Sequence, residues 1–467
     1  MIRPSICFAS ALMLVAFSLP VHQAIAQQDL PSAPSASDAV RAATPPAAPA
    51  PAAVQYPMPK PVPANFTAAS PTKEAVNAFI QTVLGSDGSK VWEVWAIQKT
   101  PAEGVSLVTI FVNDKGETHK PTGVEFYAMP DGTHFLTLDQ KGMIILPAAA
   151  QPEAAPVAAA PDTAQATASA AAPAPAAHPF PLQEPSPANF TAPLPTKETV
   201  NAFLKVSWGY DENRIWKVWA IQKTPAEGVS KVTLLVSDKS ETQKPVEVAF
   251  FAMPDGKHFI TLGQDGMDVF PFGENPFKEY REIAKQRADG PYRGSAMKDL
   301  EIVEFADFQC PHCKEAQANM EKLAVDFPKA RIVFQNFPLG NAQWKGSMPA
   351  ATYGVCVAKQ GGSGAFFTYA SAVFDGQAGL VSEDSVALTL NSAVVKAGLD
   401  PTKIAECAST PAAIATVEAS RKLAIDLNVH GTPKLIINGR QISATMPYDT
   451  IKQVILYQAK VDGVAAQ

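Results

Sequence analysis

The stretch Glu304-Phe305-Ala306-Asp307-Phe308-Gln309-Cys310-Pro311-His312-Cys313 contains two cysteines separated by two residues. An apolar run typical of a β-strand precedes the cysteines, and apolar residues at helical spacing follow them. This order predicts that Cys310 lies at a helix N-terminus, where unpaired backbone N–H groups and the helix dipole favour a thiolate over a thiol. His312 adds a hydrogen-bond donor or a positive charge. We therefore expect Cys310 to be a nucleophile and a good leaving group.

Cys-Pro-His-Cys after Val303-Glu304-Phe305 resembles the active site of the DsbA family of bacterial thiol-disulfide oxidoreductases. In that family a buried carboxylate lies six residues before the first cysteine, which is the position of Glu304 here. The family also has a cis-proline loop that faces the cysteines. Val429-His430-Gly431-Thr432-Pro433 is similar to that loop and lies over 120 residues downstream.

The resemblance implies a role for each residue of the site. Cys310 forms a mixed disulfide with the substrate, Cys313 resolves it, and His312 tunes the Cys310 thiolate; Pro311 is the other residue between the cysteines in the matching motif. Glu304 relays protons to and from Cys313. Thr432 and cis Pro433 hold the backbone of an extended substrate strand.

Each part of this site also has a plainer interpretation. Glu304 could be a surface residue of its strand, because it alternates with Val303 and Phe305, and Pro433 could be an ordinary trans proline. The two cysteines could be half of a zinc site or a structural disulfide. Zinc sites usually have four ligands in two close pairs, and the remaining cysteines are single. We therefore favour redox chemistry, with no metal and no cofactor.

Residues 274–467 read as one α/β domain. A connecting helix over 275–287 precedes a strand at 300–308, a helix at 310–326 and a second strand at 331–337, which together give a βαβ unit. The pattern is then helical over 341–427, and it closes with strands at 434–437 and 441–443 and a helix at 448–460. A thioredoxin fold with helices inserted after its second strand is the arrangement of the DsbA family.

Cys356 and Cys407 both fall in the helical insertion. We predict that they form a structural disulfide, which leaves only the Cys-Pro-His-Cys pair for exchange. Two buried free thiols are the alternative.

An internal duplication precedes this domain. Asn65-Phe66-Thr67 recurs 124 positions later as Asn189-Phe190-Thr191, and the run from Trp95 to Ser106 recurs unchanged from Trp219 to Ser230. Each copy, 63–147 and 187–273, begins with a threonine N-cap and an amphipathic helix and continues with four β-type runs. Each is therefore predicted to be a small α+β domain. The order of elements is similar to the cystatin-like dimerisation domain of the DsbC and DsbG isomerases.

The tryptophans of each copy suggest a partner for it. Trp92 and Trp95 are three residues apart, so on an extended strand they point to opposite faces, and only one can lie under the helix; Trp216 and Trp219 repeat this arrangement. An outward tryptophan is typical of an interface. We expect the two repeats to pair with each other within one chain, because the tract between them raises their effective concentration. Pairing between two chains is the alternative.

The remaining segments, at the N-terminus and between the predicted domains, indicate the cellular compartment of the protein. Residues 1–26 resemble a signal peptide, with Arg3, an apolar stretch and Ala24-Ile25-Ala26 as the cleavage site, although a retained anchor remains open. Residues 27–62 and 148–186 are Ala/Pro-rich linkers that cannot bury enough apolar surface to order themselves. We therefore expect a periplasmic or secreted protein with two movable repeat domains.

The composition and net charge limit the kinds of partner this protein can have. The chain has 467 residues, 47% hydrophobic and 18% charged, and a net charge of −6, which excludes the basic field of a nucleic-acid or anionic-membrane binder. The predicted function is a periplasmic thiol-disulfide oxidoreductase, either oxidase or isomerase, that acts on protein substrates and is recycled by a membrane or periplasmic redox partner. The alternative is a binding or scaffold protein that uses the duplicated domains and has a redox-inactive thioredoxin domain.

Overall fold

The computed structural model describes residues 56–84, 88–116, 119–139, 142–147, 180–262, 267–339 and 345–466. They form two compact units, one of the described residues within 1–99 and 106–153 and one of those within 100–105 and 154–467, which are described separately below. The predicted signal peptide and the greater part of both predicted linkers lie outside the described residues.

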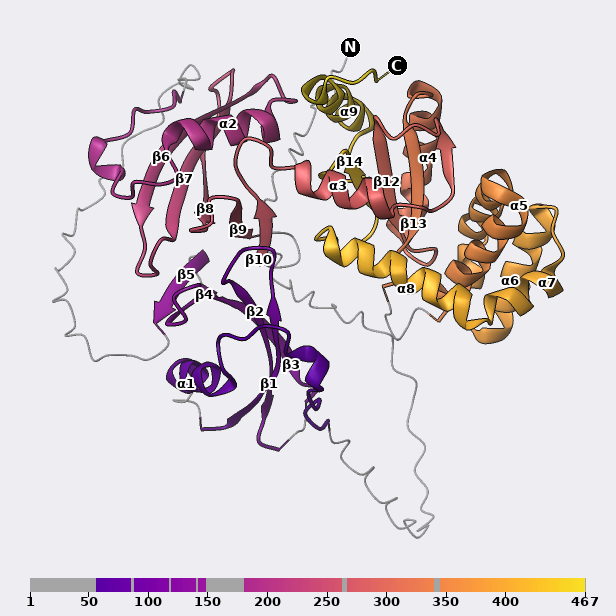
Figure 1. Cartoon of the computed structure of the whole chain (residues 1–467), viewed down its shortest axis with the longest axis horizontal. Helices are drawn as coiled ribbons and strands as arrows, with labels where there is room; N and C mark the ends of the chain where they lie inside the picture. Colours follow the sequence, from indigo (N-terminus) through magenta and orange to yellow (C-terminus); the bar gives the residue numbers. More distant parts are fainter. Residues whose placement is uncertain are drawn as a thin grey trace, which may run out of the picture. The chain divides into compact units, whose positions relative to one another are not determined.

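Repeat 1 is one helix on a five-stranded antiparallel sheet whose strands follow the chain order (Figure 1). The Thr72 hydroxyl accepts a hydrogen bond of 3.2 Å from the Ala75 amide and so caps the helix as predicted. The sequence pattern missed the fifth strand, because its apolar run does not alternate and leads directly into the Ala/Pro-rich tract. The elements are η1 (Pro63–Asn65), α1 (Lys73–Leu84), β1 (Lys90–Lys99), β2 (Ser106–Asp114), β3 (Thr122–Ala128), β4 (His134–Asp139) and β5 (Gly142–Pro147).

Trp92 and Trp95 lie on opposite faces of β1, as their spacing predicts. The Trp92 indole packs beside α1 and donates a hydrogen bond of 3.2 Å to Oδ1 of Asn77. Trp95 packs edge-on against Phe111, at a ring separation of 5.7 Å, on the face that α1 does not cover. A partner on the same sheet thus shields part of the outward tryptophan.

Repeat 2 has the same order of elements and the same antiparallel sheet, with the strand order β6-β7-β8-β9-β10. Thr196 caps its helix by accepting a hydrogen bond of 3.2 Å from the Thr199 amide. The elements are η2 (Pro187–Asn189), α2 (Lys197–Trp208), β6 (Arg214–Lys223), β7 (Ser230–Asp238), β8 (Val246–Ala252), β9 (His258–Leu262) and β10 (Met267–Pro271).

The C-terminal region contains a mixed sheet with the strand order β11-β13-β12-β14-β15. The two strands of the βαβ unit, β12 and β13, are parallel, and all other neighbours are antiparallel. The edge strand β11 was not predicted, because three residues carry no periodic signal. The strands are β11 (Tyr292–Gly294), β12 (Glu301–Ala306), β13 (Arg331–Asn336), β14 (Lys434–Ile437) and β15 (Arg440–Ser443).

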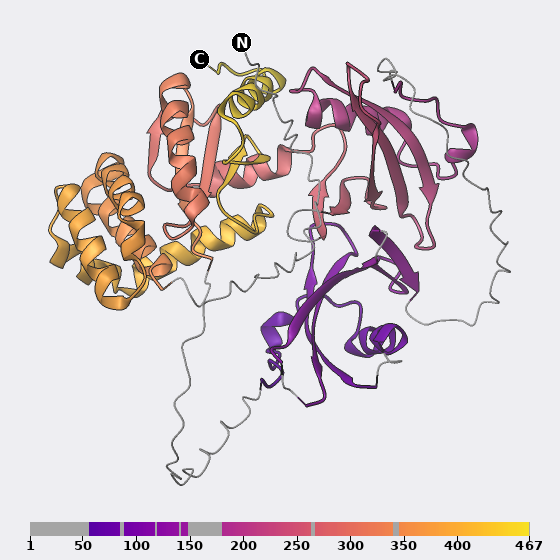
Figure 2. The ribbon, with the colours of Figure 1, turned by 180° about the vertical axis from the view of Figure 1, so that it is seen from behind.

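Helices cover both faces of this sheet. On one face, α4 (Pro311–Asp326) and α9 (Tyr448–Asp462) pack on the even-numbered side chains of β12, such as Ile302. On the other, α3 (Lys278–Arg287) and α8 (Pro411–Asp426) pack on the odd-numbered ones. The four helices and the sheet can be followed in Figure 1 and, from behind, in Figure 2. Every residue of the central strand β12 is consequently buried.

The insertion between β13 and β14 is helical, as predicted, and consists of α5 (Ser347–Asp375), η3 (Gln377–Gly379), α6 (Glu383–Lys396), α7 (Pro401–Ala408) and α8. Gly362, with φ 72° and ψ −173°, interrupts α5, which is a conformation that residues with a side chain rarely adopt. A disulfide joins Cys356 of α5 to Cys407 of α7. Among the described residues, no helix is both long and apolar enough to cross a membrane.

Arg440 connects repeat 2 to the C-terminal sheet, within the second unit. Its guanidinium is 3% exposed and donates to the last carbonyls of α2, those of Val206 at 2.5 Å and Ser207 at 2.6 Å, and to Oε1 of Gln458 at 2.9 Å. A cation at a helix C-terminus complements the helix dipole. Tyr210, just after α2, belongs to the apolar cluster under α4 and α9. Repeat 2 and the C-terminal sheet therefore share part of their core.

Candidate active site

The site begins where β12 ends. Cys310 is the N-cap residue of α4 and Pro311 is the first helical residue, a position that suits proline because the N–H it lacks would have no helical partner. The Cys310 side chain therefore lies at the positive end of the helix dipole, as the sequence indicates. Cys310 is 4% exposed, and Cys313, one turn into the helix, is fully buried.

The two thiols have opposite acidities. A hydrogen bond from the Cys313 side chain is the largest cause that lowers the pKa of Cys310, to about 6; burial opposes it, and the Thr432 side chain and the backbone amides of Cys313 and His312 add to it. Burial and the neighbouring Cys310 raise the pKa of Cys313 far above its ordinary value. At neutral pH the reduced site therefore holds one thiolate, on Cys310, and one thiol, on Cys313.

The cis-proline loop faces this pair. The Thr432–Pro433 peptide bond is cis, and the Cys310 thiol contacts the Thr432 carbonyl at 3.5 Å. The Thr432 hydroxyl is buried and makes no standard hydrogen bond to the described residues. Its presence nevertheless lowers the pKa of both cysteines. It is therefore placed to donate to a sulfur that becomes negatively charged.

Glu304 lies in the interior, under α4. Because helices cover both faces of the sheet, its side chain is only 3% exposed even though it lies opposite to Val303 and Phe305. Burial raises the pKa of this carboxyl to about 7, while a hydrogen bond of 2.9 Å from the Gln317 amide and the charge of Arg293 act in the opposite direction. Glu304 can thus both accept and release a proton near neutral pH.

Pattern reading did not find Gln317, which lies one helical turn after Cys313. Its amide donates to Oε1 of Glu304 at 2.9 Å and to the backbone carbonyl of Cys313 at 3.2 Å. The available signal was the spacing of four residues from Cys313, which places both side chains on the same helix face.

Two further side chains fix the turn that presents Cys310. Gln377 of η3 donates to the carbonyls of Phe308 at 2.8 Å and Cys310 at 3.0 Å. Asp307 accepts hydrogen bonds from the amides of Gln309 at 2.8 Å and Leu339 at 2.9 Å, and its own amide approaches Sγ of Cys313 at 3.4 Å. The helical insertion is thereby attached directly to the site, a contact that no local pattern could reveal.

His312 acts through its backbone more than its ring. The imidazole is 70% exposed and its Nδ1 atom pairs with Oε2 of Glu315 at 3.1 Å. The same pairing is the first cause that raises the pKa of His312, and the charge of Cys310 contributes last. The backbone amide of His312 is the last of the groups that lower the pKa of Cys310, and the ring is not among them, so a role of the ring in tuning the thiolate stays a prediction.

Repeat 2 reaches the same loop. Oδ1 of Asp268, on β10, lies 3.3 Å from Nε2 of His430, which also contacts Oδ1 of Asn428 at 2.9 Å. His430 precedes the cis peptide by two residues, so an acidic side chain of repeat 2 contacts the cis-proline loop. Repeat 1 has Ile144 at the position of Asp268.

In the described part of the chain, no group of three or more His, Cys, Asp or Glu side chains is placed so that it could hold a metal ion. Asn65, the first residue of the duplicated Asn65-Phe66-Thr67 run, uses its side-chain amide for a hydrogen bond of 3.0 Å to the Trp95 carbonyl. That is the role of a turn residue.

The C-terminal part of the chain is similar to known proteins. The model of the Thioredoxin family matches residues 286–456. A curated relative, the Na(+)/H(+) antiporter NhaA 3 of Salinispora tropica, is 35% identical over 69 residues, which are 15% of this chain and 10% of that protein. The antiporter NhaA of Herminiimonas arsenicoxydans is 25% identical over 167 residues, 35% of this chain and 24% of that protein. The chain thus spans a tenth to a quarter of the length of these relatives.

Two solved structures are similar to the same region. A periplasmic thioredoxin-like protein from Salmonella enterica serovar Typhimurium is 21% identical, with 39% of this chain and 97% of that chain covered and a TM-score of 0.32. The thiol-disulfide exchange protein alpha-DsbA2 from Wolbachia pipientis is 25% identical, with 38% and 94% covered and a TM-score of 0.32. The family match confirms the predicted fold: the C-terminal region is a thioredoxin-like domain with a helical insertion.

Proposed function

We propose that this chain, whose residues 286–456 match the Thioredoxin family, is a periplasmic thiol-disulfide oxidoreductase that exchanges disulfides with protein substrates through Cys310 and Cys313. The observation that carries the proposal is the unequal acidity of the pair: a Cys310 thiol with a pKa of about 6 at a helix N-terminus, beside a buried Cys313 thiol whose pKa is raised. Such a pair has one good leaving group and one group that stays protonated.

In the oxidising direction, a substrate thiolate attacks Sγ of Cys310 in the Cys310–Cys313 disulfide. The bond between the two enzyme sulfurs breaks, a mixed disulfide forms, and Cys313 leaves with the electron pair and takes a proton. A second substrate thiolate then attacks the substrate sulfur of the mixed disulfide. Cys310 leaves as a thiolate, the substrate gains a disulfide, and two electrons remain on the enzyme. Reduction of a substrate disulfide follows the same steps in reverse.

Glu304 supplies the proton in this scheme. With a pKa of about 7, the carboxyl is partly protonated at neutral pH, so it can give a proton to Cys313 when that sulfur leaves and take it back when Cys313 attacks. Gln317 is a positioning residue, because it contacts both the Glu304 carboxyl and the Cys313 backbone.

The direction of exchange distinguishes two versions of the proposal. Pro-His between the cysteines resembles the strongly oxidising members of the DsbA family, whereas Thr432 before the proline resembles the isomerases more closely. Every effect that stabilises the Cys310 thiolate raises the reduction potential, by about 30 mV for each 1.4 kcal/mol. A titration of the Cys310/Cys313 couple decides between them, and a potential as low as that of thioredoxin contradicts both.

The partners follow from the location. A cleaved signal peptide at residues 1–26 and an oxidising compartment imply substrates that are exported proteins, and a membrane or periplasmic partner that returns the couple to its working state. We propose no nucleic-acid partner and no cofactor.

The decisive experiment measures insulin reduction and the oxidation of a dithiol peptide by the chain that begins at Gln27. Cys310→Ser should abolish both activities, and Lys359→Ala, an exposed change on α5, should leave them intact. Activity that persists in Cys310→Ser contradicts the proposal. A wild-type chain inactive in both assays supports the alternative of a binding or scaffold protein that works through its duplicated domains.

A further inference from the structure

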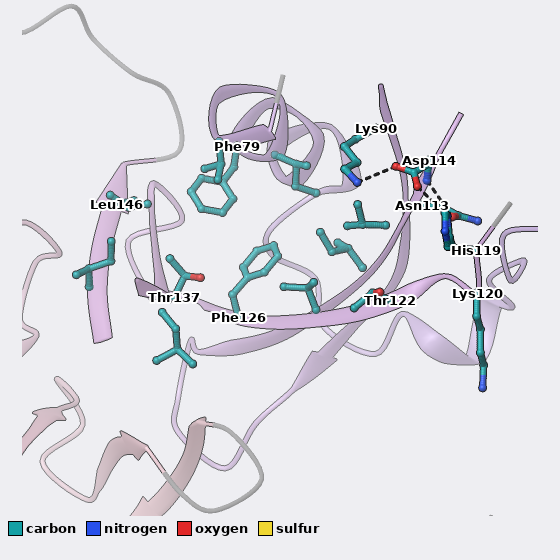
Figure 3. Close-up of a pocket in the computed structure, with 17 residues that line it drawn as sticks. Phe79, Lys90, Asn113, Asp114, His119, Lys120, Thr122, Phe126, Thr137 and Leu146 are labelled. Atoms are coloured by element: carbon teal, nitrogen blue, oxygen red, sulfur yellow. Dashed lines mark hydrogen bonds and ion pairs between the residues drawn. The ribbon is translucent and has the colours of Figure 1, made fainter. Parts of the chain in front are cut away.

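Repeat 1 contains a pocket of about 490 Å³ between α1 and the inner face of its sheet (Figure 3). Pockets for small organic ligands commonly have volumes of about 300–1,000 Å³. The walls are apolar and come from α1 and from four of the five strands. Among the residues that form them are Phe79, Val83, Ile110, Phe126, Leu138 and Leu146.

The second copy of the same domain fills the corresponding space with its own side chains. In repeat 2, Phe272 is 6% exposed, and its ring lies 4.9 Å from Phe203 and 5.9 Å from Phe250, the counterparts of Phe79 and Phe126 in the pocket wall. The residue at the position of Phe272 in repeat 1 is alanine, and Leu146 replaces Phe270. The duplication therefore produced one filled core and one core with room for a ligand.

One end of the pocket is polar. Nζ of Lys90 lies 2.7 Å from Oδ1 of Asp114, and Nδ1 of His119 lies 3.1 Å from Oδ2 of the same carboxylate. Lys120 extends from the same end, away from the apolar walls (Figure 3). These four side chains contain two ammonium groups and one carboxylate, and His119 adds positive charge when it is protonated. This end of the pocket thus has an excess of positive charge.

Repeat 2 lacks this arrangement too. Arg214, at the position of Lys90, pairs with Asp211 at 3.1 Å and lies over the Trp208 ring. Gln243 stands at the position of His119. Lys120 and Asp114 have the counterparts Lys244 and Asp238, but the described part of repeat 2 has neither the open apolar space nor the lysine and histidine that pair with Asp114 in repeat 1.

From this pairing of features we propose that repeat 1 binds an amphipathic anion, with an apolar chain between α1 and the sheet and an anionic head group at Lys90, His119 and Lys120. A fatty-acid-like carboxylate has this chemistry. The site is separate from the cysteines of the thioredoxin domain, so the proposal does not depend on the redox function.

Titration calorimetry of the full chain with dodecanoate, below the concentration at which it forms micelles, tests the proposal. We expect one site per chain, with an affinity that rises from octanoate to dodecanoate by up to about fourfold for each added methylene, since burial of one methylene contributes about 0.8 kcal/mol. Dodecyltrimethylammonium, with the same chain and the opposite charge, should bind at least about tenfold more weakly.

The duplication provides matched control variants. Leu138, 45% exposed at the mouth of the pocket, corresponds to Leu262, and Lys120 corresponds to Lys244. Leu138→Trp should weaken dodecanoate binding at least about tenfold, and Lys120→Glu should weaken it in low salt and less so in high salt. Leu262→Trp and Lys244→Glu in repeat 2 should leave binding unchanged.

Three outcomes overturn the proposal. The first is no binding of dodecanoate to the full chain, which would also result if another part of this chain or a second copy occupied the pocket. The second is binding that Leu138→Trp and Leu262→Trp weaken equally, and the third is a preference for the cationic amphiphile. Circular dichroism of each variant shows whether it retains the fold. If Leu138→Trp does not fold, the exposed change Lys120→Glu still tests the proposal.

Discussion

The Gln317 side chain donates a hydrogen bond of 2.9 Å to Oε1 of Glu304. This contact holds a buried carboxyl in one orientation next to the turn of α4 that contains Cys313. A single amide donor offsets only part of the effect of burial, since the pKa of Glu304 remains at about 7. The contact therefore positions the carboxyl without fixing its charge.

The first prediction concerns the pH dependence of stability. The pKa of Glu304 is about 7 in the folded chain and 4.5 ordinarily, so the stabilising effect of its proton is complete below pH 4.5 and is lost as the pH rises through 7. The interval corresponds to about 3 kcal/mol at 1.36 kcal/mol per pH unit. Glu304→Gln cannot ionise and should be more stable than the wild type at pH 8 by roughly this amount.

Urea denaturation of the reduced chains at pH 4.5, 6 and 8 measures the difference. It should be small at pH 4.5 and grow with pH. Glu321→Gln, on an exposed turn of α4, serves as the control and should show no such trend. A constant difference between Glu304→Gln and the wild type would mean that the carboxyl does not titrate in this range.

The second prediction concerns the acidity of Cys310. The rate of alkylation by iodoacetamide should rise with pH around a midpoint near 6, because only the thiolate reacts. The Cys313 side chain is the main cause of the lowered pKa of Cys310, so Cys313→Ala should raise the midpoint. Cys313→Ser keeps a donor and should stay closer to 6. A midpoint near 9 in the wild type contradicts this account.

The third prediction concerns the Thr432 hydroxyl. Thr432→Val removes a group that lowers the pKa of both cysteines while it retains the shape of the side chain. The alkylation midpoint of Cys310 should rise by up to about one pH unit, because a hydrogen bond to a charged group contributes about 1.5 kcal/mol. The reduction potential should fall in parallel. Thr432→Ser keeps the hydroxyl, and a shift as large as that of valine would show that packing is responsible.

The fourth prediction concerns the disulfide of the insertion. Alkylation without reductant, followed by mass spectrometry, should find Cys356 and Cys407 unlabelled and linked. The bridge closes a loop of 51 residues, so replacing both cysteines with alanine should lower the free energy of unfolding by about 4 kcal/mol on the entropic model. Two labelled thiols at these positions refute the bridge.

The fifth prediction concerns the two repeats. If they pair within one chain, light scattering should give a monomer for the chain that begins at Gln27 and a dimer for a chain that also lacks residues 27–186, because the remaining repeat must find its partner on another molecule. A full-length dimer, or a shortened monomer, argues against pairing within the chain.

The sequence alone predicts an element correctly where apolar residues recur at one spacing through the whole helix or strand. The βαβ unit, the helical insertion and the position of Cys310 at a helix start all follow from patterns within some thirty residues. The burial of Glu304 could only be argued from resemblance, because alternation along β12 puts it opposite to Val303 and Phe305. It is buried because α4 and α9 cover that second face.

The remaining features depend on contacts between distant segments. Gln377 reaches the Cys310 carbonyl from 67 residues away, and Asp268 reaches His430 from another domain. The ring of His312 pairs with Glu315, three residues later on the same helix. The spacing of three permits this contact, but the sequence alone does not show that the ring makes it. The short strands β5 and β11 pair with the neighbouring strands β4 and β13. Their own residues show no alternation that would predict a strand.

The Arg440 contact bears on where the thioredoxin-like domain of this chain can be separated from the rest. A fragment that starts at residue 274 loses the carbonyls of Val206 and Ser207 that accept from Arg440, and it uncovers the apolar cluster that Tyr210 joins, so we expect it to be less stable. A fragment that starts at residue 180 keeps both. The two repeats are also not interchangeable. Tyr210 of repeat 2 belongs to the shared core, and the sequence of repeat 1 has Ser86 at that position.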